Sequence, residues 1–456
     1  MLFHPKKGFT HTLTLQKRRK LVYGFTLIET LVGSAVFLLV ALSSYSAFKV
    51  LMSAISASQA KVAATAVANE KFEIIRNLPY DDVGVIAGLP VGKIQRNQTV
   101  TLDGFSFGIE TTIRSIDDPF DGTIGGNPGD TSPADYKMAD LDISCSNCKI
   151  FTPLKFTTLI APHALETAST NGALFVHVFD SNGISVPNAS VHIVNTQTNP
   201  DTIIDEVTDN DGWLKIVDAP PGTNAYNVTA TKSGFSQDKT YPIGGEAGAN
   251  PLNPDATVVL QQVTQASLSI DKTSLLIVSS VDGNCVALPN IGFSMTGTKL
   301  IGAPAVLKYP TANFTTDVAG NYTFSNLEPD TYETLLTSAL YDLAGTNPFP
   351  SFTVNPDEQR TLKLVAVPHV NGVLLVSVKD FSGSAIDGAT VQLEKTGFDE
   401  TKTTNSGPCP TSGQVFWNGL ASGTYTLTVS KAGYQTSISN VSVNSAWQNQ
   451  TITLTP

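Results

Sequence analysis

The feature that most constrains this chain is an apolar-dominated stretch near its N-terminus, Phe25 to Leu42, which carries one carboxylate at Glu29. A stretch of this length is close to the minimum that crosses the hydrocarbon core of a bilayer as a helix. Four consecutive cations, at positions 17 to 20, precede it. An ionised carboxylate is costly in apolar surroundings, so Glu29 is expected to have a partner there.

A basic leader followed by an apolar stretch has two general interpretations. A secretory signal peptide would be removed after a small-residue site, for which residues 53–60 could serve. A plain membrane anchor would keep the stretch as one transmembrane helix. Neither interpretation explains the acid at position 29.

A third interpretation rests on the sequence GFTLIE, Gly24 to Glu29, which resembles the processing motif of bacterial type IV prepilins and type II secretion pseudopilins. The resemblance implies that a prepilin peptidase cuts after Gly24 and methylates the new terminal amine of Phe25. It also implies that Glu29 is the assembly acid, paired with that amine of a neighbouring pilin or pseudopilin subunit. Such a pair would set register, because an unpaired charge in an apolar bundle is strongly penalised. Many pilins have a proline early in this helix, whereas here the first is Pro79.

The residues that follow predict a helix and then strands. No proline interrupts residues 25–78, which we interpret as one membrane-spanning and then amphipathic helix after a leader at 1–24. Residues 79–168 alternate in strand fashion around Asp103–Gly104, a hairpin turn pair. The fold class expected here is α+β, a long N-terminal α-helix with a small pilin-like β-meander head.

A Gly- and Pro-rich loop in the head contains a group of acids. They are Asp117, Asp118, Asp121, Asp130 and Asp135. Oxygen ligands on a flexible loop suit Ca²⁺, although the spacing matches no EF-hand, and a solvated acidic loop is the favoured interpretation.

The four cysteines give weaker signals. Cys145 and Cys148 form a CxxC without a second ligand pair for zinc, which favours a local disulfide in an exported protein and leaves two free thiols open. Cys285 and Cys409 stand in non-equivalent positions of different repeats, so the sequence gives no support for pairing them.

Beyond residue 168 the chain repeats itself about every hundred residues. The first and third repeats share a strand with an Asp-x-x-Gly turn, at Asp180 and Asp380, and a later strand beginning near Gly-Thr, whereas the middle repeat is more divergent. The repeats resemble carboxypeptidase regulatory-like modules, which implies three tandem all-β sandwiches of Ig or prealbumin type at 169–264, 265–368 and 369–456. We expect antiparallel strands, with His177 and His192 facing each other on paired strands.

Composition and motifs argue against two classes of protein, those that bind nucleic acid and enzymes. The net charge of −11 argues against a nucleic-acid surface. No nucleophile elbow or phosphate loop is evident, so an enzyme is not expected. The sequence therefore predicts a structural, minor or tip-associated pilin subunit that passes from the cytoplasmic membrane lipid to an extracellular filament. A surface ligand is a further expected partner. A secretion pseudopilin and a membrane-anchored stalk without a filament role are the alternatives.

Overall fold

The computed structural model describes residue 24 and residues 26–162 and 168–456. Residues 1–23 of the expected leader and the expected methylation site Phe25 lie outside the described residues. The chain divides into two compact units, residues 1–71, 97–110 and 142–155 in one, and 72–96, 111–141 and 156–456 in the other. Each is described by itself below.

The N-terminal helix is continuous, as predicted. Helix α1 spans Leu27–Arg76, or 50 residues, which corresponds to about 75 Å at 1.5 Å per residue. It ends shortly before Pro79, whose ring disfavours helical geometry in the residue before it. One face of its second half is buried, at Ala60, Ala63, Ala64, Val67 and Ala68. Lys71 Nζ donates to Gln98 Oε1 at 2.8 Å.

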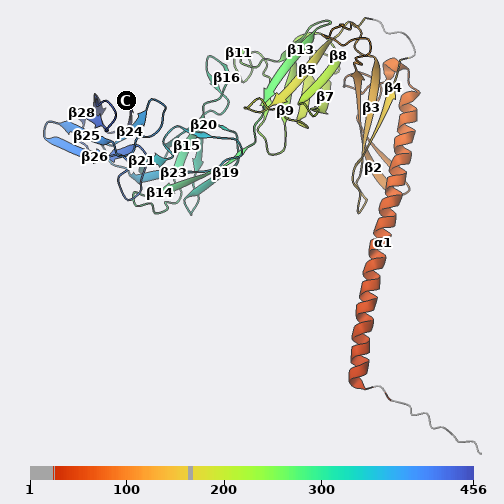
Figure 1. Ribbon diagram of the computed structural model, residues 1–456, viewed down its shortest axis with the longest axis horizontal. Helices are drawn as coiled ribbons and strands as arrows, with labels where there is room; N and C mark the ends of the chain where they lie inside the picture. Colours follow the sequence, from red (N-terminus) through yellow and green to blue (C-terminus); the bar gives the residue numbers. More distant parts are fainter. Residues whose placement is uncertain (1–23, 25, 163–167) are drawn as a thin grey trace, which may run out of the picture. The chain divides into compact units, whose positions relative to one another are not determined.

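The head is a four-stranded sheet in the order β1-β2-β3-β4 (Figure 1). The strands are β1 (Asn97–Leu102), β2 (Phe105–Ile116), β3 (Tyr136–Cys145) and β4 (Leu154–Ile160), preceded by a short 3-10 helix, η1 (Tyr80–Asp82). Asp103 and Gly104 both have positive φ, 51° and 80°, as a two-residue hairpin turn requires. The predicted hairpin is therefore present.

Three β-sandwich modules follow, each made of two sheets packed over a buried apolar core. The first module has sheets β13-β5-β8 and β10-β9-β6-β7, with β12 pairing β9. Its strands are β5 (Gly172–Phe179), β6 (Ser190–Asn195), β7 (Thr202–Val207), β8 (Trp213–Ala219), β9 (Gly222–Thr231), β10 (Asp238–Lys239), β11 (Asn250–Pro251), β12 (Ala256–Val258) and β13 (Val263–Ser269).

The second module has sheets β19-β14-β23-β21 and β18-β15-β20-β22. Its β16 pairs with β17 of the same module and with β11 of the first module. Its strands are β14 (Ser274–Val281), β15 (Gly292–Gly297), β16 (Leu300–Ala303), β17 (Val306–Leu307), β18 (Ala312–Thr315), β19 (Asn321–Leu327), β20 (Asp330–Leu336), β21 (Tyr341–Asn347), β22 (Phe352–Val354) and β23 (Gln359–Pro368).

The third module has sheets β27-β24-β30 and β26-β25-β28-β29. Its strands are β24 (Leu374–Asp380), β25 (Thr390–Lys395), β26 (Phe398–Thr403), β27 (Gln414–Trp417), β28 (Gly423–Ser430), β29 (Ser437–Val443) and β30 (Gln448–Leu454).

Two expectations about the modules need correction. The first and last strands of each module pair in parallel, β5 with β13, β14 with β23 and β24 with β30, so the sandwiches are not wholly antiparallel. After the first strand the chain crosses to the opposite sheet, and it later returns to the first sheet for the last strand. The two strands, which are far apart in the sequence, therefore lie side by side and run in the same direction. Because β13 completes the first module, the boundary lies after Ser269 and not at 264.

The sequence signals shared by the modules correspond to repeated hydrogen bonds. Asp180, Asp282 and Asp380 each accept bonds from backbone N–H groups two and four residues later, which closes the turn after the first strand. A buried tyrosine in each module donates its hydroxyl to a backbone carbonyl four or six residues upstream. These tyrosines are Tyr226, Tyr332 and Tyr425.

The two module-1 histidines are not partners. His177 lies on β5 and His192 on β6, and these strands belong to opposite sheets. The ring of His177 stacks on Trp213 with ring centroids 4.3 Å apart. His192 Nδ1 lies 2.5 Å from Asp205 Oδ1 at the surface. The expected face-to-face pair is therefore wrong, because the crossover between β5 and β6 carries the chain to the other sheet.

Candidate functional site

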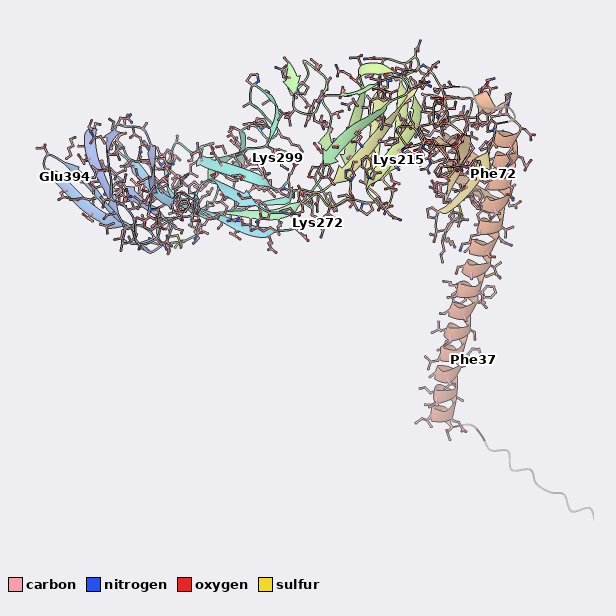
Figure 2. All side chains as sticks on the ribbon, turned by 45° about the horizontal axis from the view of Figure 1, so that its top comes forward. Phe37, Phe72, Lys215, Lys272, Lys299 and Glu394 are labelled. Carbon is pink, nitrogen blue, oxygen red and sulfur yellow. A yellow bond between two sulfur atoms is a disulfide. The ribbon has the colours of Figure 1, made fainter. Side chains whose placement is uncertain are left out.

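The first half of α1 is an uncovered apolar surface. Every large apolar side chain from Leu27 to Ile55 is exposed, with Leu27 at 85% and Phe37 at 71% (Figure 2). The most apolar 18-residue window has a mean hydropathy of 2.0 and none of it is buried. By length and composition the helix could cross a membrane, a test that a signal sequence also passes. An apolar surface this large requires a non-aqueous environment.

Glu29 lies in the first turn of this helix and forms a capping box. The backbone N–H of Glu29 donates to Thr26 Oγ1 at 3.3 Å, and the backbone N–H of Thr26 donates to Glu29 Oε2 at 3.4 Å. This reciprocal arrangement satisfies two backbone groups at the helix start. Gly24 is exposed, with nothing within 4 Å of where a Cβ would stand. Glu29 therefore has a local role in addition to any role between subunits.

The acidic loop uses its carboxylates to hold its own backbone. Asp117 Oδ2 accepts from Ile124 N at 2.9 Å, and Asp130 Oδ1 accepts from Ser132 N at 2.8 Å. Asp135 accepts from the backbone N–H of Asp118, whereas Asp121 is exposed. Across residues 26–162 and 168–456, no three His, Cys, Asp or Glu side chains are grouped as a metal ion would require.

The surroundings of Asp117 in this loop disfavour the ionised form of its carboxyl group. Burial raises the pKa of the Asp117 carboxyl, and the neighbouring carboxylates of Asp130, Asp135 and Asp121 raise it further, while the hydrogen bond from Ile124 lowers it. The loop therefore brings Asp130, Asp135 and Asp121 close enough to Asp117 to oppose its ionisation.

The structure pairs the cysteines in two disulfides. Cys145 is bonded to Cys148 at the end of β3, with Cα atoms 5.6 Å apart. Cys285 is bonded to Cys409 across 124 residues, with Cα atoms 4.9 Å apart. The second bond corrects our expectation from the sequence. Although the two positions are not equivalent in the repeat, the third module packs so that its loop meets the first turn of the second.

A buried charged cluster lies at the junction of the first and second modules. Glu328, whose side chain is 3% exposed, accepts from Lys299 Nζ at 2.6 Å, from Lys308 Nζ at 2.9 Å and from the Tyr309 hydroxyl. Burial alone would raise the pKa of Glu328, but these three hydrogen bonds outweigh burial and hold its pKa below the usual value. Lys308 also donates to Gln237 O of the first module at 2.6 Å, so the cluster joins the two modules.

The third module covers an edge strand of the second. Gln414, 1% exposed, accepts from Thr346 N at 2.9 Å and donates to Thr346 O at 2.8 Å, so its amide pairs with the free edge of β21 as a neighbouring strand would. Trp447 Nε1 donates to Leu343 O at 2.8 Å on the same strand. An open sheet edge invites pairing with other chains, and these contacts block it.

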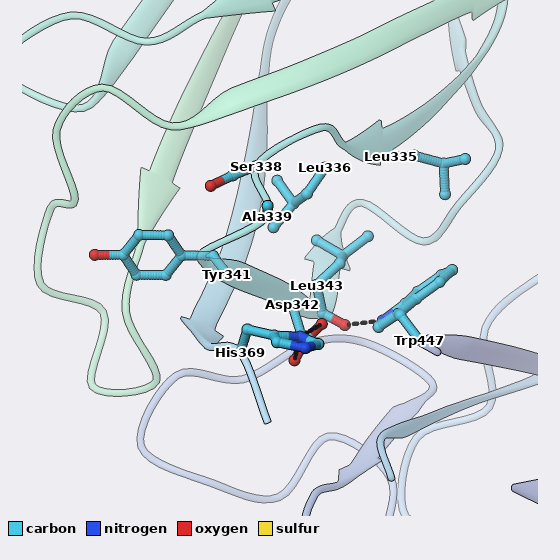
Figure 3. Close-up of a pocket in the computed structure, with 9 residues that line it drawn as sticks. All are labelled: Leu335, Leu336, Ser338, Ala339, Tyr341, Asp342, Leu343, His369 and Trp447. Carbon is cyan, nitrogen blue, oxygen red and sulfur yellow. Dashed lines mark hydrogen bonds and ion pairs between the residues drawn. The ribbon is translucent and has the colours of Figure 1, made fainter. Parts of the chain in front are cut away.

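A pocket of about 350 Å³ opens beside these contacts. Figure 3 shows its lining, which is Leu335, Leu336, Ser338, Ala339, Tyr341, Asp342, Leu343, His369 and Trp447. Asp342 is 4% exposed, and its carboxylate accepts from His369 Nδ1 at 2.9 Å and from Val370 N at 3.2 Å. Sequence reasoning missed this pocket because its residues come from three separate segments of two modules.

The fold and the exposed helix define a chain with an apolar N-terminal helix, a β head and an arm of three β-sandwich modules. Residues 373–455 match the carboxypeptidase regulatory-like domain family, so the third module is a domain of that type. The S-layer protein B of Acidianus ambivalens is 28% identical over 159 residues, which is 34% of this chain and 26% of that protein. The match therefore spans about a quarter of the length of this relative.

The similarities to solved structures are weaker. The TIE protein of Bacillus anthracis has a TM-score of 0.19 and 13% identity, covering 79% of this chain and 73% of that one. A streptococcal ancillary pilin has a TM-score of 0.18 and 13% identity, covering 62% and 98%. TM-scores this low carry no argument about the arrangement or role of the whole chain.

Proposed function

We propose that this chain is a non-enzymatic structural subunit of a type IV pilus or related filament, which displays its β-sandwich arm at the cell surface. The observation that carries the proposal is the uncovered apolar half of α1. This surface must lie in a membrane or against apolar helices of neighbouring subunits, and a filament subunit meets both environments in turn. The GFTLIE sequence at its start supports the same assignment, as does the S-layer similarity for a surface location.

In the proposed route, prepilin peptidase cuts after Gly24, and α1 keeps the protein in the cytoplasmic membrane until assembly. The amine of Phe25 in one subunit then pairs with the carboxylate of Glu29 in the next. The bulk of the arm limits how many such subunits a filament can hold, which favours a minor or tip-associated position.

A second candidate is a membrane-anchored stalk that never enters a filament. One observation favours it, because the capping box with Thr26 explains an acid at position 29 without any neighbour. The two roles of Glu29 can be separated by substitution. Glu29→Gln keeps an acceptor for the cap but removes the charge, whereas Thr26→Ala removes the cap and keeps the charge.

The experiment is to express each variant in the native host, shear filaments from the cells and measure the subunit in the filament fraction against the membrane fraction. We expect Glu29→Gln to be depleted from filaments and Thr26→Ala to enter them at near wild-type levels. Absence of the wild-type protein from the filament fraction would favour the stalk, and equal incorporation of wild type and Glu29→Gln would contradict the proposed charge pairing of Glu29.

A further inference from the structure

The pocket beside Trp447 is lined by apolar side chains and a few polar groups, as ligand sites usually are. Its volume of about 350 Å³ falls at the small end of the range for ligand pockets, and it lies between two modules, where such sites are common. We propose that it binds a single pyranose ring of a carbohydrate. The proposal concerns the arm alone and stands whether or not the chain enters filaments.

The walls of the pocket have two chemical characters. Figure 3 shows Leu336 and Ala339 facing the Asp342–His369 pair, with the Trp447 indole at one end. The indole orientation is fixed, because its Nε1 donates to Leu343 O at 2.8 Å. A pyranose ring has the same two characters, C–H groups that pack on aromatic and aliphatic walls and hydroxyls that need hydrogen-bond partners.

The charges of the lining favour a neutral ligand. None of the nine lining residues is Lys or Arg, the side chains that usually bind phosphate or carboxylate groups. Asp342 is the one carboxylate of the lining, and both of its oxygens lie within 3.0 Å of His369 Nδ1. A cationic ligand would therefore compete with His369 for this carboxylate, whereas a sugar would not.

The polar side of the pocket offers groups for hydroxyls. Because Asp342 holds His369 through Nδ1, the ring presents Nε2, which has no hydrogen-bond partner within the described ranges. Holding one ring nitrogen fixes which tautomer the other presents. Ser338 Oγ accepts from Leu340 N at 3.3 Å and keeps its own O–H to donate.

The test uses the full chain in detergent micelles and saturation-transfer NMR with free glucose, galactose, mannose and N-acetylglucosamine, together with an array of immobilised oligosaccharides that end in these sugars. Ala339→Trp fills the pocket from an exposed loop position and should abolish binding. Ala432→Trp, the same change at an exposed turn of the third module outside the pocket, should leave binding unchanged. His369→Asn places its shorter amide near the Nδ1 position and leaves the Nε2 position empty, so it should weaken binding about tenfold through loss of one hydrogen bond.

Binding of free sugars would assign the site to soluble monosaccharides, and binding on the array alone would assign it to the ends of surface glycans. Absence of binding to every probe would overturn the proposal, as would equal binding by wild type and Ala339→Trp. Filament incorporation of Ala339→Trp should match wild type, so this outcome is independent of the proposed assembly role.

Discussion

Cys285 of the second module is disulfide-bonded to Cys409 of the third, and Cys285 has a φ of 63°, in the left-handed region. The equivalent turn positions of the first and third modules are Gly183 and Gly383, with φ of 77° and 88°. The second module therefore has a cysteine where the turn geometry favours glycine. The cross-link adds a covalent constraint to the contacts of Gln414 and Trp447 at the same junction.

The first prediction concerns this disulfide. Replacing Cys285 with Gly and Cys409 with Ala should keep the turn, because glycine adopts the required φ freely. The variant should lose about 5 kcal/mol of unfolding free energy in the chain-entropy model, because the bond links residues 124 positions apart. Denaturant titration measures this loss. A Cys145→Ser, Cys148→Ser variant is the control, since its disulfide closes only three residues of separation. Equal effects would contradict the prediction.

The second prediction concerns the covered edge of β21. Gln414→Ala leaves the buried N–H and C=O of Thr346 without their partner, which should lower the unfolding free energy by about 2 kcal/mol. Gln392→Ala removes a comparable amide whose bond to Asp399 lies at the surface, and should change stability by less than about 0.5 kcal/mol. Thermal unfolding of both variants makes the comparison, and an unchanged midpoint for Gln414→Ala would count against the covered edge.

The third prediction is an acid sensitivity at the junction of the first and second modules. Because the folded-state pKa of Glu328 is lowered, its stabilisation is present above the unfolded pKa of about 4.5 and is lost as pH falls through the folded value. Glu328→Gln should therefore cost about 3 kcal/mol at pH 7 and progressively less towards pH 3. Unfolding measured between pH 3 and pH 7 gives both curves. Parallel curves would show that the cluster does not titrate as described.

The fourth prediction has the opposite sign and concerns the acidic loop. The raised pKa of Asp117 means that its ionised form opposes folding, so the favourable contribution exists below the unfolded pKa and is lost as pH rises through the folded value. Asp117→Asn should increase the protection of the loop from hydrogen exchange at pH 7, because it keeps an acceptor for Ile124 N. Asp121→Asn, at an exposed position, is the matched control and should have little effect.

The sequence predicted the features that depend on local patterns. The absence of proline from residues 25–78 predicted α1, and the Asp103–Gly104 pair predicted the β1–β2 hairpin. The pattern of strand, Asp turn and strand, repeated about every hundred residues, predicted three sandwich modules. Each of these signals lies within a few residues of the structure that it specifies.

The features that the sequence did not predict depend on contacts between distant segments. The parallel pairing of β5 with β13 joins residues about ninety positions apart, so the module boundary at 264 was placed too early. The pocket needs Asp342, His369 and Trp447 together, which only the packing of two modules provides. One signal for the second disulfide was available, because aligning the repeats puts Cys285 at the glycine position of the turn.

The most direct test of the central claim is the mass of the N-terminal peptide of the mature protein, isolated from its native host. The proposed processing predicts a chain that begins with N-methylated Phe25 and retains Glu29. A chain that begins near Lys61, as after signal peptide removal, or one that still begins at Met1, would contradict the assignment to a filament subunit.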